Sequence, residues 1–349
     1  MGRHALIAAP LLLFIAAVHF PADLRGQIRG TLKGTVTDAG TGAPLSNTNV
    51  YLSSTTIGTN TGEDGRYVLT GIPQGAFQVV ASRVGHMVAS RPIRVSGPDT
   101  LSADFRLEPV TLQGEEVQVF AHVNKEWRRL LARFRNAFLG DGENAPGCTI
   151  LNPEVLDFRM EKGTNILFAS TDSVLRIENQ ALGYRLYARL GVFEWDVDAD
   201  QGRFVLYPRF EPLIPQDSTE SARRRSNRLR SYSGSLPHFL ASLVAGTLDQ
   251  ERFLVSSGTL ANLRSGTSHP LTPDAFTLLP VPGQSLWQLS FENWLRVDYR
   301  GEETRLKSYI GLTGTTAVFD DAGNLADPLS LEVIGDWTKY RVADMLPLN

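Results

Sequence analysis

Residues 34–107 consist of short segments in which apolar and polar residues alternate, separated by turn-forming residues. Tyr67 and Leu69, for example, fall on the same face of one such segment. Asp64-Gly65 has the composition of a two-residue hairpin turn, because both residue types tolerate a positive φ. The segments recur roughly every ten residues, which is typical of a β-sandwich or barrel and disfavours a parallel βαβ fold.

The residues before these alternating segments have the composition of an export signal. Arg3 and His4 provide a short positive start, and an almost unbroken apolar run follows over residues 5–20. This run is shorter than the roughly 20 residues of a membrane-spanning helix, and it contains Pro10. We expect a signal peptide over residues 1–27, and an uncleaved N-terminal anchor is the alternative. The sequence therefore predicts an exported protein in the periplasm, at the outer-membrane surface or outside the cell, without a further transmembrane segment.

Cysteine content and net charge bear on how the fold is stabilised and on which partners are expected. Cys148 is the only cysteine, so an exported chain of this kind has no internal disulfide and depends on apolar burial for stability. A hydrophobic content of 42% is sufficient for an ordinary core, and a length of 349 residues suggests about two domains. The formal net charge of −3 gives no reason to expect a nucleic-acid partner.

Five motifs within residues 34–107 resemble those of a known domain. They are G-x-V-x-D at 34–38, T-G-x-P-L at 41–45, D-G-x-Y at 64–67, I-P-x-G at 72–75 and V-G-H at 84–86. Together they resemble the carboxypeptidase-like regulatory domain, although His86 replaces the usual aromatic residue. The resemblance implies a seven-stranded, transthyretin-like β-sandwich over residues 28–110, a fold also grouped with carbohydrate-binding-like folds. It implies an extracytoplasmic accessory module and no peptidase activity by itself.

The peptidase possibility is tested by the histidines. A zinc carboxypeptidase needs an H-x-x-E pair and a distant histidine, because catalytic zinc takes three protein ligands and keeps an open position. His86, His122, His238 and His269 are followed three residues later by Ala89, Lys125, Ala241 and Thr272. The sequence also lacks H-E-x-x-H. We therefore expect neither this zinc site nor a cofactor.

Residues 124–349 are expected to form one α+β domain that follows a linker strand at 111–123. A helix begins after Asn124, because Trp127, Leu130, Leu131, Phe134 and Phe138 follow at helical spacing. Strand-like runs then recur between residues 165 and 334, which favours a mainly antiparallel sheet. Ser218 and Ser235 are expected to cap two helices inserted between these strands.

This second part carries a resemblance of its own. Its motifs are F-L-G at 138–140, Cys148 followed by N-P-E at 152–154, I-E-N-x-A-L-G-Y at 177–184, Y-x-G-S-x-x-H-F-L at 232–240 and G-D-W-x-x-x-R at 335–341. They are similar to blocks in a group of bacterial envelope proteins that place the regulatory-like domain before an uncharacterised β-rich domain. The resemblance implies an architecture and no particular activity.

Four residues of these blocks are candidates for a polar pocket: Glu178, Tyr184, Tyr232 and His238. Glu178 and His238 are the weak catalytic candidates, as acid and base, and Tyr184, Tyr232 and His238 are the binding candidates. His238 could also activate Cys148 as a nucleophile, but the surrounding APGCTI matches no protease signature. The alternative, which we prefer, is a buried thiol and hydrogen-bonded core residues.

An acidic series and a basic run are the remaining charged features. Asp196, Asp198 and Asp200 alternate, and carboxylate oxygens suit calcium, but Gln201 stands where a calcium loop needs glycine. We interpret the series as an acidic hairpin tip. The arginines at 223, 224, 225, 228 and 230 are interpreted as a solvated helix face, with a partner contact as the alternative.

The preferred interpretation is a non-enzymatic envelope protein that binds or scaffolds a protein or glycan partner. One alternative is a hydrolase of envelope or extracellular polymers acting through Glu178 and His238. The other is an accessory protein that docks onto an outer-membrane receptor. A buried, hydrogen-bonded setting for Glu178 and His238 favours binding, whereas an open cleft with a perturbed carboxylate favours the hydrolase.

Overall fold

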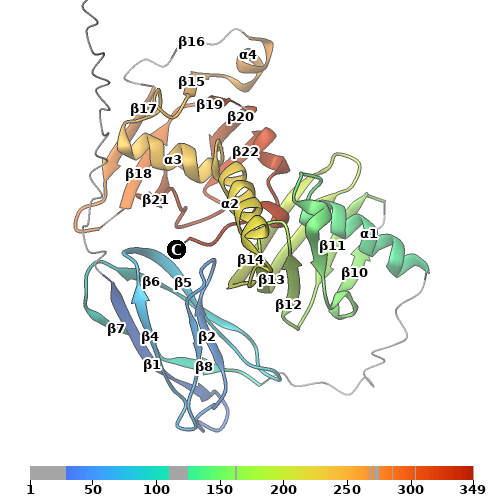
Figure 1. The fold of residues 1–349 in the computed structure, drawn as a ribbon, viewed down its shortest axis with the longest axis vertical. Helices are drawn as coiled ribbons and strands as arrows, with labels where there is room; N and C mark the ends of the chain where they lie inside the picture. Colours follow the sequence, from blue (N-terminus) through green and yellow to red (C-terminus); the bar gives the residue numbers. More distant parts are fainter. Residues whose placement is uncertain are drawn as a thin grey trace, which may run out of the picture.

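Figure 1 shows the fold as a computed structural model. The structure describes residues 29–109, 125–161, 163–266, 269–270, 275–284, 286–302 and 304–348. The predicted export signal, the linker strand and the helix cap Asn124 lie outside these residues. No helix in the described ranges is both long and apolar enough to cross a membrane.

The N-terminal part is a β-sandwich of two four-stranded sheets, drawn in blue and cyan in Figure 1. In one sheet, β1 (Gly30–Asp38) pairs with β4 (Arg66–Ile72), β7 (Thr100–Ser102) and β8 (Phe105–Leu107). The other sheet has the order β3 (Gly58–Asn60), β2 (Asn49–Leu52), β5 (Gly75–Ser82) and β6 (Ala89–Val95). The predicted sandwich is confirmed. The described residues hold one strand more than the seven predicted, because β7 and β8 pair separately with successive parts of β1.

The alternating pattern determines which side chains fill the sandwich. Tyr67 and Leu69 are both buried in its core beside Val36. The hairpin prediction for Asp64-Gly65 is wrong, because this turn connects β3 of one sheet with β4 of the other. Glycine is needed there all the same: φ at Gly65 is +72°, and a Cβ atom would lie 2.6 Å from the carbonyl oxygen of Val36.

A six-stranded antiparallel sheet follows, with α1 (Lys125–Leu139) packed on it. Its order is β10 (Asp157–Met160), β11 (Ile166–Ser170), β13 (Tyr184–Asp196), β12 (Leu175–Asn179) and β9 (Cys148–Ile150), with β14 (Gln201–Pro212) also paired to β13. Phe134 of α1 stacks on Phe138 and contacts Phe193 of the sheet, both at ring distances of 4.7 Å. The predicted helix and its apolar stripe are confirmed.

A second group of sheets forms a separate core. The five-stranded sheet has the order β16 (His269–Pro270), β15 (Phe253–Gly258), β19 (Trp294–Arg300), β20 (Arg305–Leu312) and β22 (Leu331–Gly335). The three-stranded sheet has the order β17 (Phe276–Pro280), β18 (Leu286–Phe291) and β21 (Ala317–Asp320). Phe239 and Leu240 of α3 (Leu236–Ala245) fill this core, and α4 (Leu260–Ser265) lies beside β15.

The residues predicted to form one α+β domain thus contain two hydrophobic cores, and the domain limits stay a prediction. The chain returns to the first of these cores at its end. After the 3₁₀ helix η3 (Asp336–Lys339), Val342 and Ala343 of η4 (Val342–Asp344) are buried against the six-stranded sheet. Two further 3₁₀ turns, η1 (Ala145–Gly147) and η2 (Pro153–Val155), flank β9.

One of the two predicted helix caps is confirmed and the other is wrong. Ser235 caps α3 as predicted, since its side chain accepts a hydrogen bond from the amide of His238. The prediction for Ser218 is wrong, because Ser218 is the first residue of α2 (Ser218–Tyr232) and Asp217 caps the helix. The Asp217 carboxylate accepts the amide of Glu220 at 2.7 Å, and its negative charge also suits the positive end of the helix.

Candidate binding site

The candidate site lies where the sandwich meets the two C-terminal cores. The turn after β2 is inserted against β14, with a parallel β-bridge between Thr55 and Arg209. The amide of Phe210 donates to the carbonyl of Thr55 at 2.8 Å, and the hydroxyl of Tyr51 donates to the carbonyl of Tyr207 at 3.1 Å. Thr55 and Tyr51 are both buried, so the sandwich is docked against the six-stranded sheet through a buried contact.

Ser54 is the centre of this junction. Its amide donates to the carbonyl of Pro208 at 2.6 Å, and its own carbonyl accepts the amide of Leu348 at 2.8 Å. The φ of Ser54 is +61°, a conformation that few non-glycine residues adopt. One residue therefore joins the sandwich, β14 and the segment at residues 341–348, which we call the C-terminal segment.

Ser54 and Leu348 line two cavities, of about 590 Å³ and about 680 Å³. The larger cavity lies between β5, β6, β14 and the loop around Asp327. We take the smaller one as the candidate site and call it the junction pocket, because a mainly apolar wall with few polar groups is typical of ligand sites. Its wall is made of Ser54, Ser231, Tyr232, Ser235, Leu236, Pro237, Ala322, Asn324, Val333, Trp337, Thr338, Tyr340, Arg341, Asp344, Met345, Leu346, Pro347 and Leu348.

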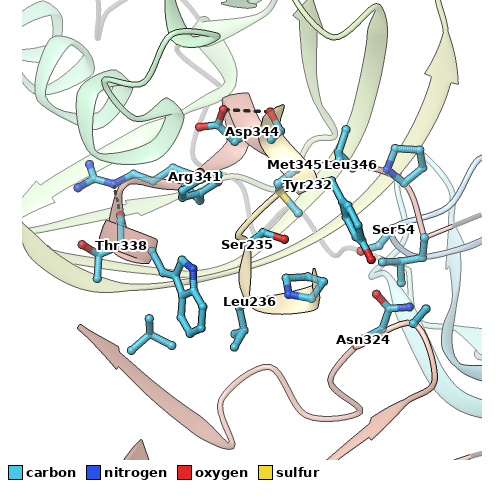
Figure 2. Close-up of a pocket in the computed structure, with 18 residues that line it drawn as sticks. Ser54, Tyr232, Ser235, Leu236, Asn324, Thr338, Arg341, Asp344, Met345 and Leu346 are labelled. Atoms are coloured by element: carbon cyan, nitrogen blue, oxygen red, sulfur yellow. Dashed lines mark hydrogen bonds between the residues drawn. The ribbon is translucent and has the colours of Figure 1, made fainter. Parts of the chain in front are cut away.

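Figure 2 shows the junction pocket with Tyr232, Ser54 and Asn324 gathered on one side. Tyr232 ends α2 and is 38% exposed, so its ring is available to a ligand. Partial burial raises the pKa of its phenol, and the nearby Glu251 carboxylate adds to this effect. Burial raises the pKa of Tyr340 to about 12. Both phenols therefore stay neutral hydrogen-bonding groups.

The charged residues of the wall are already engaged. Asp344 accepts hydrogen bonds from the Asn144 amide at 2.7 Å and the Ser231 hydroxyl at 3.4 Å, and burial raises its pKa. The guanidinium of Arg341 lies over the Trp195 ring at 4.5 Å and does not offer a free positive charge. The junction pocket thus presents apolar surface with neutral hydroxyl and amide groups.

Arg341 holds the C-terminal segment in place. Its Nη1 donates to the carbonyls of Asn136 and Ala137, near the end of α1, and its Nη2 pairs with Asp200 at 3.0 Å. No basic residue lies in the last turn of α1, so this distant arginine supplies the positive group that a helix C-terminus favours. The arginine of the G-D-W-x-x-x-R motif at 335–341 therefore has a structural role.

His238 supports the pocket from behind. Its Nδ1 accepts the amide of Gly234 at 2.9 Å, and its Nε2 lies 3.1 Å from the Glu251 carboxylate. These contacts assign the proton of a neutral ring to Nε2. The ring also packs against Tyr232 at 4.9 Å, so both nitrogens and one face are occupied. His238 is buried and positions Tyr232 in the wall.

Glu178 and Tyr184 lie on the six-stranded sheet, away from the junction pocket wall. The Glu178 carboxylate accepts hydrogen bonds from Arg185 and Gln180, and these bonds hold its pKa below the usual value. Tyr184 is buried, with the Arg228 guanidinium 4.2 Å from its ring centre. The interpretation of Glu178, Tyr184, Tyr232 and His238 as one pocket is therefore wrong, because the first two lie on β12 and β13 and do not line the junction pocket.

Cys148 and the acidic series also have structural settings. Cys148 is buried in β9, and burial raises the pKa of its thiol to about 12. The Asp196 carboxylate accepts the amide of Asp198, the Asp198 carboxylate bonds to the Asn165 side chain, and Asp200 pairs with Arg341. These carboxylates stabilise the β13–β14 turn. Over the described ranges, no three His, Cys, Asp or Glu side chains gather as metal ligands do.

The sequence did not indicate most of the pocket wall. Ser54, Asn324 and the C-terminal segment belong to parts of the chain that are remote in sequence and meet only in the folded protein. Trp337 was visible within the last motif, and its indole donates to the carbonyl of Gly234 at 2.6 Å. Tyr232 and Trp337 each belong to one of the sequence motifs, and this membership was the signal that the sequence offered for the site.

Comparison with solved structures gives weak overall likeness. Catechol 1,2-dioxygenase from Acinetobacter sp. ADP1 is 15% identical, over 26% of this chain and 55% of its own, with a TM-score of 0.22. A cohesin–X-dockerin complex from Acetivibrio cellulolyticus is 19% identical, over 21% and 51%, with a TM-score of 0.19. A Bacteroides uniformis protein with a provisional carbohydrate-binding description is 9% identical, over 88% and 98%, with a TM-score of 0.20.

The chain spans about half the length of the first two of these proteins. Scores this low support no inference about function. No curated protein sequence matches this chain.

The family comparison is more specific. The sequence profile of the CarboxypepD_reg-like domain matches residues 32–119, the region in which the five motifs and the sandwich occur. The blocks from Phe138 to Arg341 lie outside this match, and their resemblance to an envelope group stays a prediction. It is therefore residues 32–119 of this chain that are similar to the CarboxypepD_reg-like domain family.

Proposed function

We propose that this chain is an exported, non-enzymatic binding protein whose junction pocket holds an apolar group of a protein or glycan partner at the cell envelope. One observation carries the proposal. A pocket of about 590 Å³ lies where Ser54 of the regulatory-like sandwich meets residues of the C-terminal part, and its wall offers aromatic and neutral polar groups. A pocket of this size and chemistry suits a side chain or a ring of a ligand.

The settings of the predicted catalytic residues favour binding over hydrolysis. The Glu178 carboxylate is in an ion pair with Arg185 and is ionised at neutral pH, so it lacks a proton to donate as an acid. Both nitrogens of His238 are engaged. The hydrolase alternative through these two residues would require both arrangements to break before any step.

The location and the partner rest on the sequence. The apolar run at 5–20 supports export, and the regulatory-like domain supports an accessory role in the envelope. Docking onto an outer-membrane receptor is one form that this role could take. The tight docking of Thr55 against Arg209 favours a partner that contacts the assembled junction rather than the sandwich alone.

The proposal is tested with the purified full chain and a Tyr232→Ala variant. Leu279→Ala is a matched control, because Leu279 is exposed apolar surface on β17 outside the junction pocket. Binding is measured on an immobilised glycan array and by crosslinking to isolated envelopes. We expect the parent chain to be retained on the glycan array or on the envelopes. Tyr232→Ala should reduce this retention, and Leu279→Ala should leave it unchanged. Equal retention of all three proteins on both would contradict the proposal.

A further inference from the structure

We propose that one face of α2 extends the junction pocket into a docking surface for an acidic peptide segment of a partner protein. This inference rests on the proposed function and names the chemistry of its ligand. The face consists of Ser218, Ala222, Arg225, Leu229 and Tyr232, which we call the α2 stripe. Tyr232 belongs to both the stripe and the pocket wall, so the two surfaces are continuous.

The stripe follows from helix geometry. Arg225, Leu229 and Tyr232 are four and three residues apart, and residues at these spacings lie one above the other on the same helix face. The buried residues of α2 are Arg224, Asn227 and Ser231, which lie on a different face. The α2 stripe is therefore directed away from the packed side of the helix.

The stripe combines exposed apolar surface with small residues. Leu229 is 64% exposed and Tyr232 is 38% exposed, although α2 is otherwise strongly polar. Ser218 and Ala222 have short side chains, which leave room for a chain to lie along the helix. An aliphatic and an aromatic side chain next to an apolar pocket provide the contact that an apolar anchor of a peptide needs.

Charge identifies the kind of partner. Arg223 and Arg224 lie near the Glu220 carboxylate, at 3.7 and 2.9 Å, and Arg230 lies 3.5 Å from Glu143. Within the described part of the chain, Arg225 forms no ion pair or hydrogen bond. The stripe therefore carries one unpaired positive charge, which complements a carboxylate of the ligand.

The spacing between the two contacts predicts the spacing in the ligand. Arg225 and Tyr232 are seven positions apart in the helix, which is a rise of roughly 10 Å. A peptide in the polyproline II conformation covers this distance in roughly three residues, and its three-residue turn places the side chains at i and i+3 on the same side. The partner segment thus has an apolar or aromatic residue for the junction pocket and an acidic residue roughly three positions away.

The probes are short fluorescent Gly/Ser peptides that contain a tryptophan and, roughly three positions from it, either aspartate or lysine. Binding to the full chain is followed by fluorescence polarisation at low and high salt. We expect the aspartate peptide to bind about fivefold more tightly than the lysine peptide at low salt, with a smaller ratio at high salt. Arg225→Glu reverses this preference, and Leu229→Ser weakens both peptides.

Two variants serve as controls, because a general effect of charge or folding would change peptide binding in them as well. Arg223→Glu makes the same charge change on the opposite side of α2, and Leu279→Ser removes an exposed apolar side chain elsewhere. Both are expected to leave the peptide preference unchanged. Equal effects of Arg225→Glu and Arg223→Glu would overturn the docking surface.

Other outcomes separate this inference from the proposed function. Failure of both peptides to bind, while Tyr232→Ala still reduces retention on the glycan array, overturns the inference and leaves the binding function standing. Binding to anionic lipid vesicles that Arg225→Glu abolishes, without discrimination between the peptides, also overturns it. Failure of every arm, including the array and the envelope crosslinking, contradicts both proposals.

Discussion

The amide of Leu348 donates a hydrogen bond of 2.8 Å to the carbonyl of Ser54, which joins the C-terminal segment to the turn after β2. Both residues line the junction pocket and the neighbouring cavity. The contact places Ser54 of the sandwich in a pocket wall that residues between 231 and 348 otherwise form.

Replacement of Leu348 by proline removes the donor of this bond. We expect the C-terminal segment to detach from Ser54, at a cost of about 1 kcal/mol in the free energy of unfolding. Leu348→Ala keeps the amide and is the matched control. Hydrogen exchange at Met345 and Leu346, which keep their amides in both variants, measures the effect, and equal exchange in the two variants would argue against it.

Replacement of Ser54 by valine tests the positive φ at the junction. A β-branched residue strongly disfavours a φ of +61°, so Ser54→Val should destabilise the protein by about 1–3 kcal/mol. Ser54→Gly adopts this φ without strain and should change stability by less than about 1 kcal/mol. Urea unfolding compares the two, and an equal loss would show that the conformation itself is not the cause.

Arg341 and Asp200 should respond very differently to substitution. Arg341→Met leaves the end of α1 and its carbonyls without their buried donor, and we expect a loss of about 2–4 kcal/mol. Asp200→Asn changes an exposed side chain that keeps an oxygen able to accept from Trp195, and it should cost less than about 1 kcal/mol. Thermal unfolding of both variants checks this. A comparable loss in both would mean that the ion pair, rather than the helix cap, dominates.

Asp344→Asn is expected to increase stability at neutral pH. Burial raises the pKa of Asp344 in the folded protein, so the folded state holds its proton to a higher pH than the unfolded state does. Stability is therefore lost as the pH rises from the usual carboxyl value of 3.8 through the raised folded value. The amide is neutral throughout and avoids this loss.

Glu178→Gln is expected to show the opposite dependence of stability on pH. Hydrogen bonds from Arg185 and Gln180 lower the pKa of Glu178, so its contribution to stability is present above the usual value and is lost as the pH falls. We expect Gln at this position to be destabilising at neutral pH and nearly neutral at low pH. Chemical denaturation across pH 3–8 compares the two variants with the parent chain. Parallel curves for all three proteins would contradict both assignments.

Local spacing along the chain was sufficient to predict much of the fold. The buried faces with Tyr67 and Leu69, the α1 stripe with Phe134 and Phe138, and the Ser235 cap all depend on residues a few positions apart. The cap at Ser218 could not be separated from Asp217 by such patterns, because both residue types cap helices and they are adjacent. The Asp64-Gly65 turn was recognised, but its two flanking strands belong to different sheets.

The sequence by itself determined the regulatory-like sandwich, the mainly antiparallel strands and the lack of an H-x-x-E zinc motif, because each depends on residue type and local periodicity. Only the tertiary structure decided that Tyr232 lines a pocket, that His238 supports it and that Glu178 lies elsewhere. A pocket arises where remote segments meet, and the docking of Ser54 against β14 and Leu348 is a long-range contact that no local pattern encodes.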